Sequence, residues 1–88
     1  MKVVHRLVGY DRRTDRMKTS CNIPADVLAE AKRIAGVSSD DPDAAWSYPL
    51  SIQQARSIAL LIQIEIDPNR LEFFLEPFAD SAADGTRP

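Results

Sequence analysis

Catalytic and ligand-binding side chains are scarce in this sequence. Its 88 residues include one cysteine, one histidine and three glycines. Cys21 alone cannot form an intramolecular disulfide or a thiolate cage for a metal, and the three glycines lie too far apart to form a phosphate-binding loop. His5 has no neighbouring nucleophile or carboxylate that would complete a catalytic set. We therefore expect no cofactor, no metal and no catalytic centre within one chain.

Long apolar runs are absent as well. No stretch of about 18 apolar residues is available for a transmembrane helix. Residues 1–10 lack the apolar core of a signal peptide because Arg6 interrupts it. We therefore expect a cytoplasmic protein without membrane contact. A composition of 44% hydrophobic and 27% charged residues is typical of a globular domain.

The first third of the chain predicts a β-hairpin. Residues 2–10 are rich in β-forming side chains, and residues 16–23 alternate between apolar and polar side chains, as in a half-buried antiparallel strand. The polar residues 11–15 between them are suited to a hairpin loop, because aspartate tolerates turn geometry.

The rest of the chain predicts two helices and one more strand. An apolar stripe at helical spacing indicates a helix over residues 25–35, which Gly36 would end. Ser51 and Gln54 match a capping box that would begin a second helix, extending to about residue 64. Alternation over residues 70–78 indicates a strand, with Pro77 typical of an edge or a strand end.

These elements predict one α+β domain over residues 1–78. Their order is ββααβ, and we expect the two helices to pack on one face of a three-stranded, mainly antiparallel sheet. Residues 79–88 are small and polar, so we expect a flexible tail there. An exposed edge, on the first or third strand, would offer a route to a homo-oligomer.

The loop over residues 38–50 combines aromatic, acidic and proline residues. Tryptophan and tyrosine dominate binding hot spots, and carboxylates complement a basic partner. The candidate partner-binding residues are therefore Asp40, Asp41, Asp43, Trp46 and Tyr48. The alternative is that the two aromatic side chains fold back as a lid over a small core.

The same aspartates do not match a calcium-binding loop. Counted from Asp41, positions 1 and 3 are acidic, but position 5 is Ala45 and position 12 is Ile52. A solvated acidic loop is therefore the preferred interpretation.

Charge is distributed unevenly around the net value of −2. Residues 1–18 contain six basic and two acidic side chains, and residues 65–88 contain six acidic and two basic ones. Basic side chains clustered on a hairpin are typical of nucleic-acid surfaces. The residues of this alternative patch are Arg6, Arg12, Arg13, Arg16 and Lys18. The acidic overall composition and the aspartates within the hairpin count against this interpretation.

Five short segments of the sequence, together with Asp67, form a pattern: Tyr10–Thr14, Asp40–Pro42, Tyr48–Leu50, Gln54–Ala55 and Phe73–Glu76. In this pattern the sequence resembles a family of small uncharacterised bacterial proteins, and the resemblance covers roughly residues 3–78. The family has no established activity. Its members are similar in size and acidity to immunity or accessory proteins encoded beside bacterial toxins, which implies a binding role by analogy.

Three functions follow as hypotheses. The first is a small accessory protein that contacts another protein, as an inhibitor or immunity protein does. The second is a nucleic-acid-binding regulator that uses the basic hairpin. The third is an enzyme, which would require a site shared between subunits because one chain offers too few catalytic groups.

Overall fold

The computed structural model of the protein describes residues 3–79, and it contains the predicted N-terminal hairpin. β1 (Val3–Asp11) pairs antiparallel with β2 (Met17–Asn22). In the connection, the Asp11 carboxylate accepts hydrogen bonds from the backbone N–H groups of Arg13 (2.7 Å) and Thr14 (3.1 Å). Asp11 therefore initiates the turn, because its side chain accepts hydrogen bonds from backbone N–H groups two and three residues further on, as aspartate commonly does in turns.

Both predicted helices form, and both use the expected end signals. α1 (Ala25–Ala35) is followed by Gly36 in the left-handed conformation, with φ 72°. α2 (Ile52–Leu61) begins with the complete capping box between Ser51 and Gln54. The second helix ends three residues earlier than expected, and the chain reaches a left-handed backbone at Gln63, with φ 61°.

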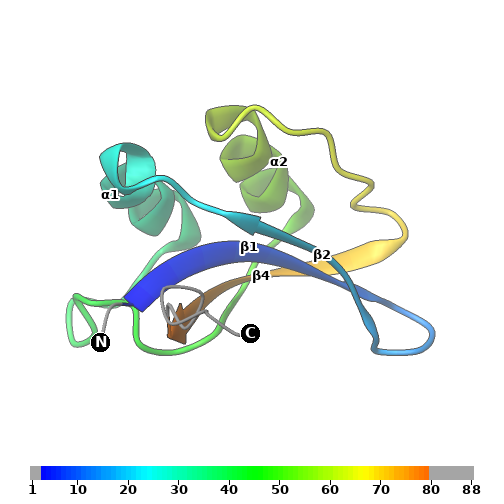
Figure 1. The fold of residues 1–88 in the computed structure, drawn as a ribbon, viewed down its shortest axis with the longest axis horizontal. Coiled ribbons are helices and arrows are strands. Elements are labelled where there is room, and N and C mark those ends of the chain that lie inside the picture. Colours follow the sequence, from blue (N-terminus) through cyan, green and yellow to red (C-terminus); the bar gives the residue numbers. More distant parts are fainter. Residues whose placement is uncertain (1–2, 80–88) are drawn as a thin grey trace, which may run out of the picture.

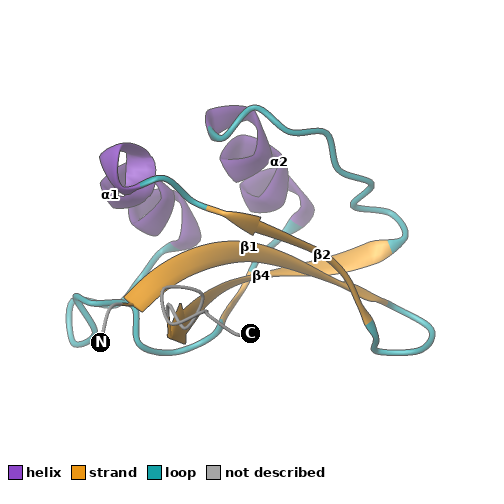
Figure 2. Ribbon diagram, viewed as in Figure 1, coloured by secondary structure: helices purple, strands orange, loops and turns teal. Residues whose placement is uncertain are grey.

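The prediction of three strands in the order ββααβ is wrong in detail. The antiparallel sheet has four strands, which lie in the spatial order β2, β1, β4 (Leu71–Ala79) and β3 (Tyr48–Pro49). The first three of these strands can be followed in Figures 1 and 2. The additional strand, β3 (Tyr48–Pro49), lies between the two helices in the chain. Two residues are too few to show an alternation, so only the pairing with β4 (Leu71–Ala79) reveals this strand.

Strand order also corrects the expectation about edges. β1 is internal and pairs with β4 over nine positions, from Val3↔Ala79 to Asp11↔Leu71. The first strand therefore offers no free edge. The predicted tail begins one residue too early, because Ala79 belongs to β4, and residues 80–88 lie outside the described residues.

Pro77 lies where β4 extends past its short neighbour β3. The Leu50 N–H donates to the Phe73 carbonyl (2.9 Å), so the N–H and C=O groups of Phe73 face away from β1. In a β-strand every second residue directs these groups to the same side, so those of Leu75 and the backbone of Pro77 also face away from β1. The nitrogen of Pro77 therefore lies on the open side of β4. A residue without an N–H at this position removes a donor from an exposed edge, which opposes pairing with another strand.

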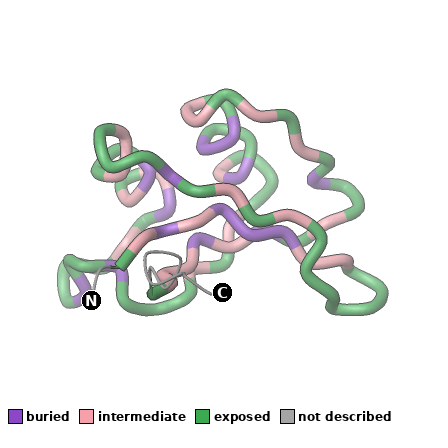
Figure 3. Tube along the Cα trace, viewed as in Figure 1, coloured by how far each residue is buried: buried purple, intermediate pink, exposed green. Residues whose placement is uncertain are grey.

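The core lies between the sheet and the two helices, which cover the same face (Figure 1). Buried stretches of the chain run along the middle of β1 and along one side of each helix (Figure 3). The largest fully buried side chains of this core are Leu7, Ile58, Phe73 and Leu75. Neither described helix is long and apolar enough to cross a membrane.

Candidate functional site

The loop between α1 and β3 is organised around the carboxylate of Asp41. This carboxylate accepts hydrogen bonds from the N–H of Ala45 (2.9 Å), the N–H of Trp46 (3.3 Å) and the hydroxyl of Tyr48 (2.7 Å). Asp41 itself is buried. Its carboxylate is therefore occupied inside the chain and shapes the loop, whereas the sequence had placed it among residues that would face a partner.

The same hydrogen bonds keep Asp41 ionised. The Ala45 N–H has the largest effect and lowers the pKa of the Asp41 carboxyl below its ordinary value of 3.8, against the opposing effect of burial. The hydroxyl of Tyr48 and the N–H of Trp46 lower this pKa further. In return, the hydrogen bond to Asp41 raises the pKa of the Tyr48 phenol.

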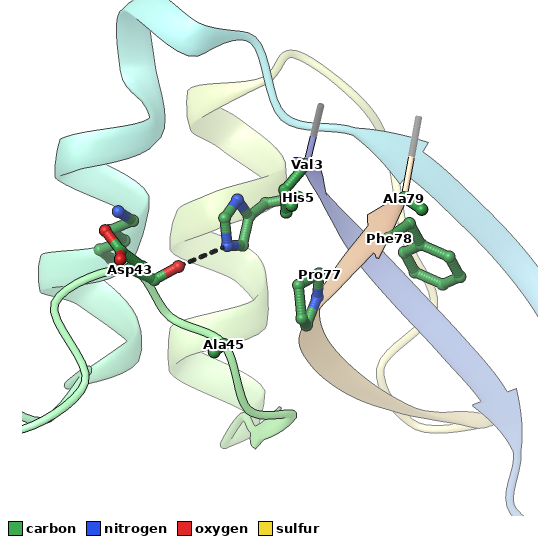
Figure 4. Close-up of a pocket in the computed structure, with 8 residues that line it drawn as sticks. Val3, His5, Asp43, Ala45, Pro77, Phe78 and Ala79 are labelled. Carbon is green, nitrogen blue, oxygen red and sulfur yellow. Dashed lines mark hydrogen bonds between the residues drawn. The ribbon is translucent and has the colours of Figure 1, made fainter. Parts of the chain in front are cut away.

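His5 holds the loop from the side of the sheet. Its Nε2 atom lies 3.1 Å from the carbonyl oxygen of Asp43 (Figure 4). The same atom lies 3.0 Å from the carbonyl oxygen of Ala44. Carbonyl oxygens only accept, so Nε2 carries the hydrogen. The other ring nitrogen, Nδ1, is buried and has no hydrogen-bond partner among residues 3–79. His5 therefore connects β1 to the loop.

Two further side chains hold the loop from α1 and from β4. The Lys32 ammonium donates to the Pro42 carbonyl (3.0 Å), and the Ser47 hydroxyl donates to the Glu76 carboxylate (3.1 Å). Hydrogen bonds from a helix and two strands therefore converge on residues 41–48. Loops that carry function are commonly positioned by a rigid scaffold in this way.

The two aromatic residues of the loop have different environments. Tyr48 is half-buried and packs against the core cluster. Trp46 is 70% exposed. Of the two aromatic side chains, only Tyr48 therefore folds back over the core. The indole of Trp46 is exposed to solvent, while the Trp46 N–H donates a hydrogen bond to Asp41.

A cavity of about 600 Å³ lies beneath the loop at the end of the sheet. It is lined by Val3, His5, Lys32, Asp43, Ala45, Pro77, Phe78 and Ala79 (Figure 4). Most of these side chains are apolar, and this volume lies in the range of small-ligand pockets. The sequence did not indicate this cavity, because it arises from the β1–β4 register, which pairs Val3 with Ala79 and His5 with Pro77.

Charged residues surround this region without forming a metal centre. Asp40 and Asp43 are exposed, and Asp43 also lines the cavity. No group of three potential metal-ligating side chains occurs in the part of the chain that the structure describes.

The alternative basic patch is divided by the fold. Four of its members, Arg12, Arg13, Arg16 and Lys18, are exposed at the hairpin tip. Arg6 is half-buried and lies apart from them, with its guanidinium 4.9 Å from the centre of the Phe78 ring and bonded to Ser20 (3.2 Å). Arg70, which the sequence did not indicate, lines a pocket of about 290 Å³ with Arg12, Arg13, Asn69 and Asp11.

Comparison with known proteins identifies a family but no activity. No curated protein and no solved structure matches the chain. A family model described as "Domain of unknown function (DUF7683)" matches residues 5–76. The matched segment extends from His5, which holds the loop on β1, to Glu76, which holds it on β4. The chain therefore belongs to the DUF7683 family, whose function is unknown.

Proposed function

We propose that the protein is a small accessory protein that binds another protein through the loop at residues 40–48, as an inhibitor or immunity protein does. One observation carries this proposal. Trp46 is largely exposed on a loop whose conformation is held by hydrogen bonds that the Asp41 carboxylate accepts and the His5 ring donates. A large apolar side chain left in solvent on a fixed backbone is typical of a binding anchor.

The fixed loop favours binding for an entropic reason. Ordering a flexible side chain or loop on association opposes binding by about 0.5–1.5 kcal/mol for each immobilised side chain. Here the backbone around Trp46 is already ordered by contacts with α1, β1 and β4. A partner would therefore gain the burial of the indole with little loss of conformational freedom in this loop.

Charge favours a basic partner. The loop carries the exposed carboxylates of Asp40 and Asp43, against Lys32 on the adjacent helix. Complementary potentials accelerate association and select among partners. We therefore expect the association to weaken as salt is added, because exposed charge pairs are screened.

Capture of partners from an extract of the source cells tests this proposal. The bait proteins are the wild type, Trp46→Ala and the matched control Leu60→Ala. Leu60 is suitable because it is 80% exposed on α2, so its removal also takes away an exposed apolar side chain. Captured proteins are quantified at low and high salt for each bait.

The proposal predicts a salt-sensitive partner that the wild type and Leu60→Ala retain and that Trp46→Ala loses. Folding of each bait is verified by its unfolding free energy. Equal capture by all three baits would contradict a role for Trp46. Loss of capture together with a loss of several kcal/mol in Trp46→Ala would assign the residue to folding instead.

A further inference from the structure

The cavity beneath the loop adjoins the exposed tryptophan. Ala45 lines the cavity and is followed directly in the chain by Trp46. Consecutive Cα atoms lie about 3.8 Å apart, so the backbone of Trp46 lies next to a residue that lines the cavity. A partner segment that contacts Trp46 therefore also reaches an opening of about 600 Å³.

The walls of this cavity suit an aliphatic side chain. Val3, Pro77 and Ala79 come from the paired ends of β1 and β4, and Ala45 comes from the loop. Val3 is 58% exposed, so part of this apolar surface is in contact with solvent in the free protein. Covering such surface stabilises a complex by about 25 cal/mol for each Å² removed from water.

The charges at the rim suit a guanidinium. Asp43 is one of the residues that line the cavity, and Asp40 is exposed in the same loop. The basic lining residue, Lys32, already donates to the Pro42 carbonyl. An indole face attracts a cation, and arginine is the side chain found there most often. Arginine also matches a carboxylate with two parallel N–H donors.

We propose that the site recognises a partner segment in which an arginine is flanked by aliphatic residues. An aliphatic side chain enters the cavity lined by His5, while the guanidinium lies over Trp46 and pairs with Asp43. This inference rests on the proposed binding role of the loop and names the chemistry of the segment that it binds.

The sequence offers one spectroscopic reporter for each half of this site. His5 is the only histidine and lines the cavity, and Trp46 is the only tryptophan and directly follows the lining residue Ala45. The probes are three capped tripeptides, leucine–arginine–leucine, leucine–glutamate–leucine and glycine–arginine–glycine. Binding of each is followed by Trp46 fluorescence and by the NMR signals of the His5 ring.

We expect leucine–arginine–leucine to bind saturably and to move both reporters. Replacing arginine with glutamate removes the cation and adds repulsion, which should weaken binding about tenfold. Replacing the leucines with glycine should weaken binding by a similar factor and leave the His5 signals unmoved. Asp43→Asn should weaken binding of the arginine peptides severalfold, while the matched variant Asp15→Asn, at the distant hairpin turn, should not.

Three results would overturn the inference. The first is equal affinity for the leucine–arginine–leucine and leucine–glutamate–leucine peptides. The second is a Trp46 fluorescence change that saturates while the NMR signals of His5 do not shift. The third is no binding of any peptide up to about 10 mM. None of them removes the proposed binding role. The binding role is tested separately, by comparing how much partner Trp46→Ala and Leu60→Ala capture. A partner whose binding segment has a different chemistry would therefore leave the binding role intact.

Discussion

The Nε2 atom of His5 lies 3.0 Å from the carbonyl oxygen of Ala44, which is 39 residues further along the chain. Ala44 is fully buried and has a left-handed backbone, with φ 50°. An alanine in this conformation is disfavoured by about 1 kcal/mol. The hydrogen bond from His5 helps to offset this strain and fixes the direction of the chain two residues before Trp46.

Replacing His5 with leucine should lower the free energy of unfolding by about 1–3 kcal/mol. The volume of the side chain is nearly kept, but the carbonyls of Asp43 and Ala44 lose their buried donor. Urea denaturation measures this change. His5→Gln, which keeps an N–H donor, should recover part of the loss. A change below about 0.5 kcal/mol for His5→Leu would show that the loop does not depend on this contact.

Replacing Asp41 with asparagine should change how stability depends on pH. The folded pKa of Asp41 is lowered, chiefly by the Ala45 N–H. The stability that this carboxylate contributes is therefore present above its ordinary pKa of 3.8 and is lost as pH falls through the lower folded value. The Asp41→Asn variant should be less stable than the wild type near pH 7. Its free energy of unfolding should also fall less than that of the wild type when the solution is acidified.

The control for this experiment is Asp15→Asn, since Asp15 is exposed at the tip of the hairpin. Unfolding free energies of the three proteins are measured from about pH 7 to about pH 2. If the curves of the wild type and Asp41→Asn run parallel, the carboxylate does not organise the loop in the folded protein.

Replacing Gly9 with alanine should lower the free energy of unfolding by about 1–3 kcal/mol. A Cβ at this position would lie 2.8 Å from Cε1 of Phe73 and 3.1 Å from Cδ1 of Leu71. Phe73 is buried in the core and cannot move away cheaply. Thermal or urea unfolding measures the effect, and an unchanged midpoint would indicate that the sheet packs differently against this ring.

Gly36→Ala is the matched comparison, because its penalty has a different origin. No atom lies within 4 Å of a Cβ at this position, but φ is 72°. The free energy of unfolding should fall by about 1 kcal/mol, because an alanine is disfavoured in the left-handed backbone conformation. Gly36→Asn should therefore recover part of it, since asparagine tolerates this conformation. A Gly36→Asn variant no more stable than Gly36→Ala would contradict this origin.

Trp46→Ala should change the free energy of unfolding by less than about 0.5 kcal/mol. The side chain is mostly in solvent, so its removal exposes little that was buried. Tyr48→Ala should cause a much larger loss, because that ring packs on the core and donates to Asp41. Parallel urea denaturations compare the two variants. Similar losses would mean that both aromatic residues serve the core.

Local patterns were sufficient to predict most of the fold. The hairpin, α1 and the start of α2 follow from alternation, helical spacing and the end signals at Gly36 and Ser51. β3 could not be predicted in this way, since two residues carry no periodicity and its only support is the pairing with Leu75 and Phe74. Strand order depends on the same long-range pairing.

The candidate site was predictable only in part. Composition drew attention to Trp46, Tyr48 and the aspartates, but it did not separate exposed residues from structural ones. That separation depends on which donors reach Asp41 and on His5, Lys32 and Glu76, which approach the loop from other elements. Contacts between segments up to 39 residues apart leave no spacing signal in one sequence.

The loop presents Trp46 on a rigid backbone, and ¹⁵N relaxation of the Ala45 and Trp46 amides measures that rigidity. The hydrogen bonds from both amides to Asp41 predict order parameters of about 0.85, equal to those of the strands. Values below about 0.6 at these two amides would instead show a flexible loop that Asp41 does not hold.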